Sequence, residues 1–303
     1  MIFKNKTFLV TGGAGFVGSH TVAALIKKGA RVIIIDNLST GKKANVHPKA
    51  KFYNIDLTDP KLETIFKKEN PDYVYHFAFN VQVPKSVENP AMDAESIMAS
   101  LHLLKHAAKA GVKKVVFSSS SFVYGNNPSP RLKENAPIDP LNPYIISKHT
   151  VENYLNFYRI AHGLPYVVLR YATVYGPLQV MGAMADYIRT LKADGQARIW
   201  GDGTKARDYV YIEDVVRANL LALNVPNDFK SPIFNVGTGV ETTLNEVYQT
   251  IAKILKKPAL PIYLPDRPGE LMRFSLDSSK IQKELGWEPR IRIQEGIRKI
   301  LRS

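Results

Sequence analysis

The chain has 303 residues, of which 45% are hydrophobic and 22% charged, and it contains no cysteine. This balance is typical of a folded globular protein and excludes long disorder or a fibrous repeat. No apolar run approaches the roughly 20 residues that cross a bilayer, and the start lacks the features of a signal peptide, so we expect a cytoplasmic protein. The lack of cysteine excludes disulfides, thiol nucleophiles and thiolate metal sites.

Lysine and arginine outnumber the acidic residues by 14. Such an excess suits a nucleic acid, an anionic membrane or a small anionic ligand. The positive charges are spread along the chain and alternate with acidic residues, as in Lys283-Glu284, instead of forming a continuous run. This pattern is typical of solvated helix faces, so we expect neither a nucleic acid nor a membrane as partner.

Up to about residue 176, strand-like and helix-like segments alternate. That order predicts an α/β fold with a doubly wound parallel sheet of the Rossmann type. Strands are expected at 7–10, 31–35, 51–54, 73–77, 115–117 and 167–169, with one helix ending at Gly29 and others over about 60–69, 92–110 and 144–162.

After Gly176-Pro177 the predicted elements become shorter and Gly- and Pro-containing loops more frequent. Such loops often separate structural regions. We therefore predict a dinucleotide-binding domain over 1–176 and a smaller, mainly substrate-binding region over 177–303. Part of 205–236 is expected to return to the first domain.

A glycine-rich turn, 11–18, follows the first expected strand and precedes a helix. Glycines let the backbone approach a pyrophosphate, and the helix N-terminus offers amide groups to it. Asp36 ends the next strand, where a carboxylate accepts hydrogen bonds from a ribose and repels a 2′-phosphate, which favours NAD over NADP. Lys42 and Lys43 could instead pair with such a phosphate, and a purely structural turn remains the alternative.

Asp56-Leu57 closes the third expected strand. A carboxylate there is within reach of an adenine amino group. It would serve equally well as the N-cap of the next helix. The sequence leaves both interpretations open.

Tyr144 and Lys148 lie four residues apart at the start of an expected helix. This spacing places both on one face, where a cation favours the phenolate and makes the tyrosine a general base. The serines of 118–121 follow a strand and are therefore expected at the carboxyl end of the sheet, where ligands bind in such folds.

Ten motifs, in this order along the chain, resemble those of a known family. They are TGGAGFVGSH (11–20), DNLSTG (36–41), HFA (76–78), VPKSVENP (83–90), FSSSSFVYG (117–125), PYIISK (143–148), LRYATVYGP (169–177), GDGTKARDYVYIEDV (201–215), NVGTG (235–239), and RPGE with LGWEP (267–270 and 285–289). The sequence resembles the UDP-glucose (UDP-galactose) 4-epimerases, within the extended short-chain dehydrogenases/reductases.

The resemblance implies that Tyr144 is the base, that Lys148 binds the nicotinamide ribose and lowers the pKa of the tyrosine, and that Ser120 hydrogen-bonds the sugar 4-oxygen. It implies tightly bound NAD and transient oxidation at C4 of a UDP-sugar, with no net redox change. The implied cofactor contacts are Gly12, Gly15, Phe16, Val17, Gly18, Asp36, Asn37, Ser39, Thr40, Gly41, Asp56, Leu57, Phe77, Ala78, Ser118, Tyr144, Lys148 and Tyr171.

The resemblance also implies a substrate site. Arg207 and Arg267 would bind the diphosphate, Glu270 a ribose hydroxyl and Trp200 the uracil, while a bulky Phe274 would disfavour an N-acetyl group on the sugar. Further implied substrate contacts are Val83, Ser120, Tyr144, Thr173 and Met184.

The sequence departs from the family pattern at Thr173 and Ser96, where asparagines are usual, and at Phe79, where a small residue is usual. Ser121-Phe122 replaces the Asp-Glu pair of nucleotide-sugar dehydratases, and Phe122 replaces the glutamate of UDP-glucuronate decarboxylases. The resemblance therefore favours 4-epimerisation, most of all of UDP-galactose and UDP-glucose.

Several alternatives stay open. They are epimerisation of the N-acetylated or uronate UDP-sugars, a nucleotide-sugar dehydrogenase or reductase, and a non-catalytic RNA-binding member of the superfamily. His102 and His106 lack an accompanying carboxylate pattern, so no metal site is predicted. The resemblance implies a homodimer through the helices near 92–110 and 144–162.

Overall fold

The computed structural model describes residues 3–127, 129, 131–258, 260–266 and 272–302. The chain divides into two compact units. The first comprises Met1–Val123, Pro140–Arg170 and Val216–Phe234, and the second comprises Tyr124–Asp139, Tyr171–Val215 and Asn235–Ser303.

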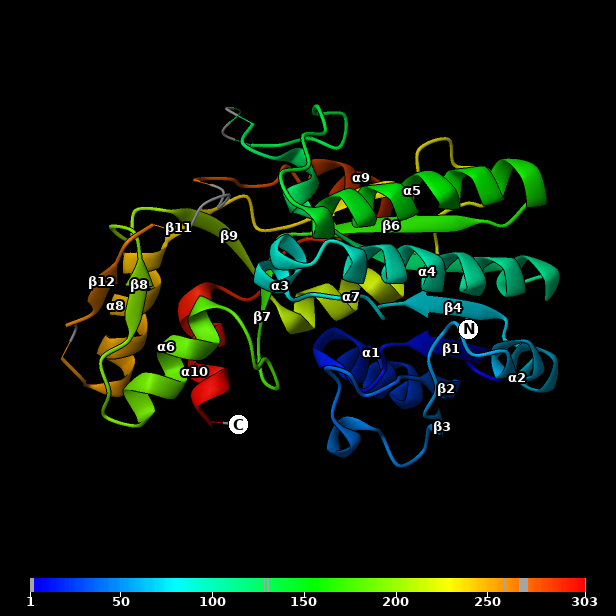
Figure 1. The fold of residues 1–303 in the computed structure, drawn as a ribbon, viewed down its shortest axis with the longest axis horizontal. Helices are drawn as coiled ribbons and strands as arrows, with labels where there is room; N and C mark the ends of the chain where they lie inside the picture. Colours follow the sequence, from blue (N-terminus) through cyan, green and yellow to red (C-terminus); the bar gives the residue numbers. More distant parts are fainter. Residues whose placement is uncertain (1–2, 128, 130, 259, 267–271, 303) are drawn as a thin grey trace. The chain divides into compact units, whose positions relative to one another are not determined.

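The first unit is built on a seven-stranded sheet with the strand order β10-β6-β5-β4-β1-β2-β3 (Figure 1). The neighbouring pairs β1–β2, β1–β4, β2–β3 and β4–β5 are parallel. The order reverses at β1, which is the topological switch of a doubly wound sheet, so the predicted fold class is confirmed. The strands are β1 (Thr7–Thr11), β2 (Arg31–Ile35), β3 (Lys51–Tyr53), β4 (Tyr73–His76), β5 (Lys114–Ser120), β6 (Tyr166–Tyr171) and β10 (Ile233–Val236).

Helices connect these strands, and α4 and α5 lie side by side along the sheet (Figure 1). Leu9, Val74 and Val115 of the central strands are fully buried beneath them. No helix in the described part of the chain is long and apolar enough to cross a membrane. The connecting helices are α1 (Phe16–Lys27), α2 (Lys61–Glu69), α3 (Val83–Glu88), α4 (Ala91–Lys109), α5 (Pro143–His162) and α7 (Ile212–Ala222), with 3₁₀ turns at Lys43–Asn45 and Ser121–Tyr124.

The ends of α5 follow from local sequence. The side chain of Asn142 accepts a hydrogen bond from the Ile145 amide, and Pro143 occupies the first turn, where its missing N–H costs nothing. Gly163 ends the helix with a φ of 64°, which glycine adopts without strain. This helix carries Tyr144 and Lys148.

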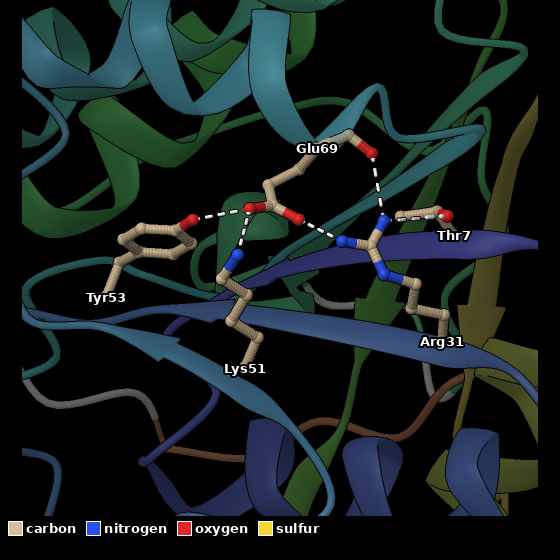
Figure 2. A network of polar contacts seen from close by, with 5 residues as sticks. All are labelled: Thr7, Arg31, Lys51, Tyr53 and Glu69. Atoms are coloured by element: carbon tan, nitrogen blue, oxygen red, sulfur yellow. Dashed lines mark hydrogen bonds and ion pairs between the residues drawn. The ribbon is translucent and has the colours of Figure 1, made fainter.

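A buried carboxylate connects helix α2 with strands β2 and β3 (Figure 2). Glu69, at the end of α2, accepts hydrogen bonds from Lys51 Nζ at 2.6 Å and the Tyr53 hydroxyl at 2.5 Å, and it pairs with Arg31. Burial alone would raise the pKa of Glu69, but these partners lower it. Arg31 is the first residue of β2, and Lys51 and Tyr53 are the first and last residues of β3, so the network ties α2 to these two strands.

The second unit holds two small sheets. In the three-stranded sheet β11-β9-β7, β9 pairs antiparallel with β11 and parallel with β7, and the other sheet is the parallel pair β12–β8. Its elements are β7 (Thr173–Tyr175), α6 (Ala183–Lys192), β8 (Arg198–Trp200), β9 (Ala206–Tyr211), β11 (Glu241–Thr243), α8 (Leu244–Leu255), β12 (Ile262–Leu264), α9 (Ser279–Leu285) and α10 (Ile293–Arg302).

Candidate active site

The glycine turn between β1 and α1 leaves no room for a Cβ at Gly12 or Gly18. Gly12 has a φ of 68°, and a Cβ there would lie 2.6 Å from the Ala78 amide nitrogen. A Cβ on Gly18 would lie 2.1 Å from the Gly12 carbonyl oxygen. No side chain of the described residues caps α1, so the amides of its first turn are available to an anion. The turn therefore fits the pyrophosphate of a dinucleotide.

Asp36 directly follows β2, and its carboxylate contacts the glycine turn. Its carboxylate accepts hydrogen bonds from the Ala14 amide at 2.9 Å and the Leu38 amide at 2.8 Å. A carboxylate has about four acceptor positions, so it retains capacity for ribose hydroxyls. Among the other predicted cofactor residues, Asn37, Ser39, Thr40 and Gly41 lie in the loop that follows β2.

Asp56 lies in the loop between β3 and α2. Helix α2 begins at Lys61, whose amide donates to Asp59, so Asp56 is not its N-cap. Instead Asp56 accepts hydrogen bonds from Thr58 and from the Asn37 side chain, the latter at 2.8 Å. Burial would raise the pKa of Asp56, but these hydrogen bonds lower it. Two predicted cofactor residues, Asn37 and Asp56, are thus brought together.

His76 connects the end of β4 to β1 by a hydrogen bond. Its Nδ1 lies 2.8 Å from the Thr11 hydroxyl and its Nε2 lies 2.9 Å from the Ser100 hydroxyl. Burial, together with the charge of Lys148, lowers the pKa of His76 to about 3, so the ring is neutral near pH 7. The Thr11 hydroxyl also accepts a hydrogen bond from the Ala78 amide, which fixes the chain beside Gly12.

Lys148 and the serine end of β5 meet in the core of the first unit. The Lys148 ammonium donates to the Ser118 carbonyl at 2.7 Å, and Lys148 is 2% exposed. Burial lowers the pKa of Lys148 to about 7, although the charge of Glu152 opposes the shift. The Ser118 hydroxyl donates to the His76 carbonyl, and the Ser120 hydroxyl accepts from the Phe122 amide. Ser120 therefore keeps its own proton for a ligand.

Tyr144 is half-buried on the same face of α5, with its ring centroid 5.9 Å from Lys148 Nζ. That Lys148 lowers the pKa of Tyr144 stays a prediction. Burial raises the pKa of Tyr144 above 10, and the negative charge of Asp93 raises it further. The spacing of four residues aligns the two side chains, but the ammonium is bound to Ser118 and does not offset these effects.

The geometry of the glycine turn and of the Tyr144–Lys148 pair agrees with the protein family that the sequence matches. The chain matches the NAD dependent epimerase/dehydratase family over residues 8–237. The chain belongs to this family. The family resemblance drawn from the motifs is thus confirmed, and NAD is the cofactor of the family.

Individual relatives cover almost the whole chain. A putative UDP-glucose 4-epimerase of Methanocaldococcus jannaschii is 40% identical over 299 residues, 97% of this chain and 96% of that protein. The structure of a Thermotoga maritima UDP-glucose 4-epimerase with UDP-glucose has a TM-score of 0.94 at 41% identity and covers 98% of this chain and 97% of that one. A Methanobrevibacter ruminantium UDP-N-acetylglucosamine 4-epimerase has a TM-score of 0.92 at 36% identity, covering 99% and 98%.

In this member of the family, Arg207 and Phe274 of the second unit lie together. The guanidinium carbon of Arg207 is 5.6 Å from the centre of the Phe274 ring, and its Nη1 donates to the Ala206 carbonyl at 2.9 Å. Phe274 is 2% exposed. Thr173 begins β7, Trp200 ends β8 and Met184 lies in the first turn of α6. Arg267 and Glu270 lie outside the described residues.

The remaining predicted positions lie near the ends of strands and helices. Phe77 and Ala78 follow β4, Leu57 follows β3, Tyr171 ends β6 and Val83 begins α3. Gly15, Phe16 and Val17 lie at the start of α1. No group of three or more metal-ligating side chains occurs among the residues that the structure describes.

One ion pair that supports the site was not predicted from the sequence. Glu152, one turn after Lys148, forms an ion pair with Arg170 of β6 at 2.6 Å, and both side chains are 3% exposed. A signal was present, because Arg170 interrupts the apolar run of its strand and Glu152 repeats the spacing of Tyr144 and Lys148. Such a charge in a buried strand requires a partner.

Proposed function

We propose that this protein is an NAD-dependent 4-epimerase of UDP-sugars, with UDP-galactose and UDP-glucose as its preferred pair. The observation that carries the proposal is the position of Tyr144 and Lys148 on one face of α5, beside the serine end of β5 and in the same unit as the glycine turn. The similarity to 4-epimerases of UDP-sugars over nearly the full chain supports it.

In the proposed reaction, Tyr144 accepts the proton of the sugar 4-hydroxyl and Ser120 donates a hydrogen bond to the 4-oxygen. Lys148 binds the nicotinamide ribose through its ammonium. When bound, NAD would supply reversible hydride transfer at C4, with the hydride returned to the other face of the sugar. Because burial raises the pKa of Tyr144, the phenolate requires a positive charge nearby once the site is filled.

The residues that would hold NAD are those of the first unit described above. The glycine turn and α1 would bind the pyrophosphate, and the Asp36 carboxylate would bind the adenosine ribose. A carboxylate at that position repels a 2′-phosphate, so we propose NAD and not NADP. Asp56 would reach the adenine amino group.

The second unit would hold most of the sugar nucleotide, in keeping with a mainly substrate-binding role for 177–303. Arg207, with Arg267, would clamp the diphosphate, because guanidinium groups bind phosphate oxygens in pairs. Glu270 would bind the ribose of UDP and Trp200 the uracil. The bulk of Phe274 favours a sugar without an N-acetyl group.

Incubation of the purified protein with single UDP-sugars, without added NAD, tests this function. UDP-galactose should give UDP-glucose, and acid extraction should release NAD from the protein. The same incubation with UDP-N-acetylgalactosamine and UDP-glucuronate tests the alternative sugars. Comparable turnover of the N-acetylated sugar contradicts the role given to Phe274, and turnover only with added NAD indicates a dehydrogenase or reductase.

We also propose a homodimer formed through α4 and α5. Met98 of α4 and Ile146, Phe157 and Ile160 of α5 are apolar side chains exposed to solvent in the single chain. Light scattering should give twice the mass of one chain. Ile160→Glu should give a monomer, and Val240→Glu, on an exposed apolar residue of the second unit, should leave the dimer intact.

A further inference from the structure

The ammonium of Lys148 lies among aromatic rings. Its Nζ is 3.9 Å from the centre of the Phe79 ring and 4.7 Å from that of Phe117. The Tyr144 ring is more distant, at 5.9 Å. A cation within about 6 Å of a ring face is attracted by the ring's electrons. Phe79 makes the closest of these approaches.

Hydrogen bonding to the ammonium is sparse by comparison. An ammonium group can donate three hydrogen bonds, and Lys148 donates one to a described residue, the carbonyl of Ser118. With Lys148 only 2% exposed, water cannot surround the remaining N–H groups. The faces of Phe79 and Phe117 therefore take the place of part of its solvation.

Phe79 also contacts the proposed base. Its ring meets the Tyr144 ring edge to face, with centroids 6.0 Å apart and planes at 77°. It lies 6.2 Å from the Phe117 ring, at 59°. One side chain thus touches both members of the Tyr144–Lys148 pair.

We propose that Phe79 is a positioning residue for Lys148, whose ring stabilises the charged ammonium and holds it at the Ser118 carbonyl. The inference rests on the proposed function only for the role of Lys148 toward the nicotinamide ribose. Without the ring's attraction, the buried lysine would give up its proton at lower pH and lose the charge with which it binds.

Several titratable groups surround the same ammonium. Burial lowers the pKa of Lys148 to about 7, so a small change in its surroundings alters its charge near neutral pH. The groups that face it or its partners are Tyr144 and Glu152 from α5, neutral His76 from β4, Asp93 from α4 and Arg170 from β6. Replacing the Phe79 ring leaves all of them in place.

The test replaces Phe79 by pentafluorophenylalanine, which keeps the shape of the ring and reverses the charge on its face. The titration of Lys148 is followed by NMR of its ε-carbon in the purified protein containing ¹³C-lysine, with Lys148→Met to assign the signal. The midpoint should fall by about one pH unit relative to wild type. Phe79→Tyr, which keeps an electron-rich ring, should retain the wild-type midpoint.

The same fluorinated residue at Phe66 is the matched control. Phe66 is buried in the same unit and stacks on His106 instead of an ammonium, so the Lys148 titration should not move. An unchanged or higher midpoint with the fluorinated ring at 79 overturns the inference, as does an equal fall from the control. A wild-type protein that epimerises no UDP-sugar contradicts the proposed function alone, because the NMR comparison needs no turnover.

Discussion

Glu152 and Arg170 form a buried ion pair in which Arg170 Nε and Nη2 both donate to the carboxylate, at 3.1 and 2.6 Å. The pair joins α5, which carries Tyr144 and Lys148, to strand β6. The carboxylate also favours the charged form of Lys148, one turn earlier on the helix. One carboxylate therefore supports both the fold and the charge in the site.

We predict that Glu152→Gln lowers the free energy of unfolding by about 3–5 kcal/mol, because it removes the carboxylate charge that pairs with the buried Arg170 guanidinium. Chemical denaturation followed by circular dichroism measures this loss. Asp186→Asn is the control, since it removes an exposed ion pair with Arg189 and should cost less than about 1 kcal/mol. Similar losses in the two variants would contradict the special role of burial.

The glycine turn gives a second prediction. Gly18→Ala places a methyl group against the Gly12 carbonyl, and the backbone must move. Overpacking of about 1–3 kcal/mol in the turn corresponds to roughly 5- to 150-fold weaker NAD binding. The NAD released by acid from purified protein measures the effect. Gly111→Ala, at a positive φ but with nothing within 4 Å of the added Cβ, should be less stable than wild type and yet retain its NAD.

The sequence predicted the glycine turn and the long helices of the first unit well, because the sequence signals for these elements are local. The turn needs glycines at fixed spacing, and the helices expected over about 60–69, 92–110 and 144–162 occur at Lys61–Glu69, Ala91–Lys109 and Pro143–His162. Short elements were missed, among them α3 and the seventh strand β10. Neither is long enough to show a periodic pattern, and β10 is defined only by pairing with β6.

The surroundings of Tyr144 and Lys148 could not be predicted in the same way. Helix spacing gives the direction of both side chains but not the group that the ammonium reaches. That group is the carbonyl of Ser118, and Phe79 lies over the ammonium from a distant part of the chain. Burial and Asp93, which raise the pKa of Tyr144 in this structure, likewise act through tertiary contacts that helix spacing does not show.

Asp93 provides a third prediction. It is 1% exposed, and neither carboxylate oxygen has a hydrogen-bond partner among the described residues. Its charge raises the pKa of Tyr144, so Asp93→Asn should lower that pKa and move the acid limb of the pH–rate profile to lower pH. Glu95→Gln, an exposed position on the same helix, should leave the limb in place. A limb unmoved by Asp93→Asn would show that its charge does not act on the base.

The buried His76 predicts how stability depends on pH. Its pKa is lowered from 6.5 to about 3 in the folded protein, so the unfolded chain binds the extra proton between these values. The contribution of His76 to the free energy of unfolding is fully present above pH 6.5. It falls by about 1.4 kcal/mol per pH unit on acidification toward pH 3. Denaturation of wild type and His76→Gln at several pH values isolates this slope, which the variant should lack. Ser100→Ala removes a hydrogen bond to His76 but no titrating group, so it should lower stability and keep the slope.

The proposed base gives the most direct prediction. Tyr144→Phe removes only the phenol oxygen, and general acid–base catalysis contributes about 100- to 10,000-fold, so epimerisation should slow by that factor. The ring remains to pack against Phe79, and NAD should stay bound in wild-type amount. Product sugars measured by chromatography, together with the NAD content, separate loss of chemistry from loss of cofactor. Tyr154→Phe, exposed on the same helix, should behave as wild type, whereas turnover retained by Tyr144→Phe would assign the base to another residue.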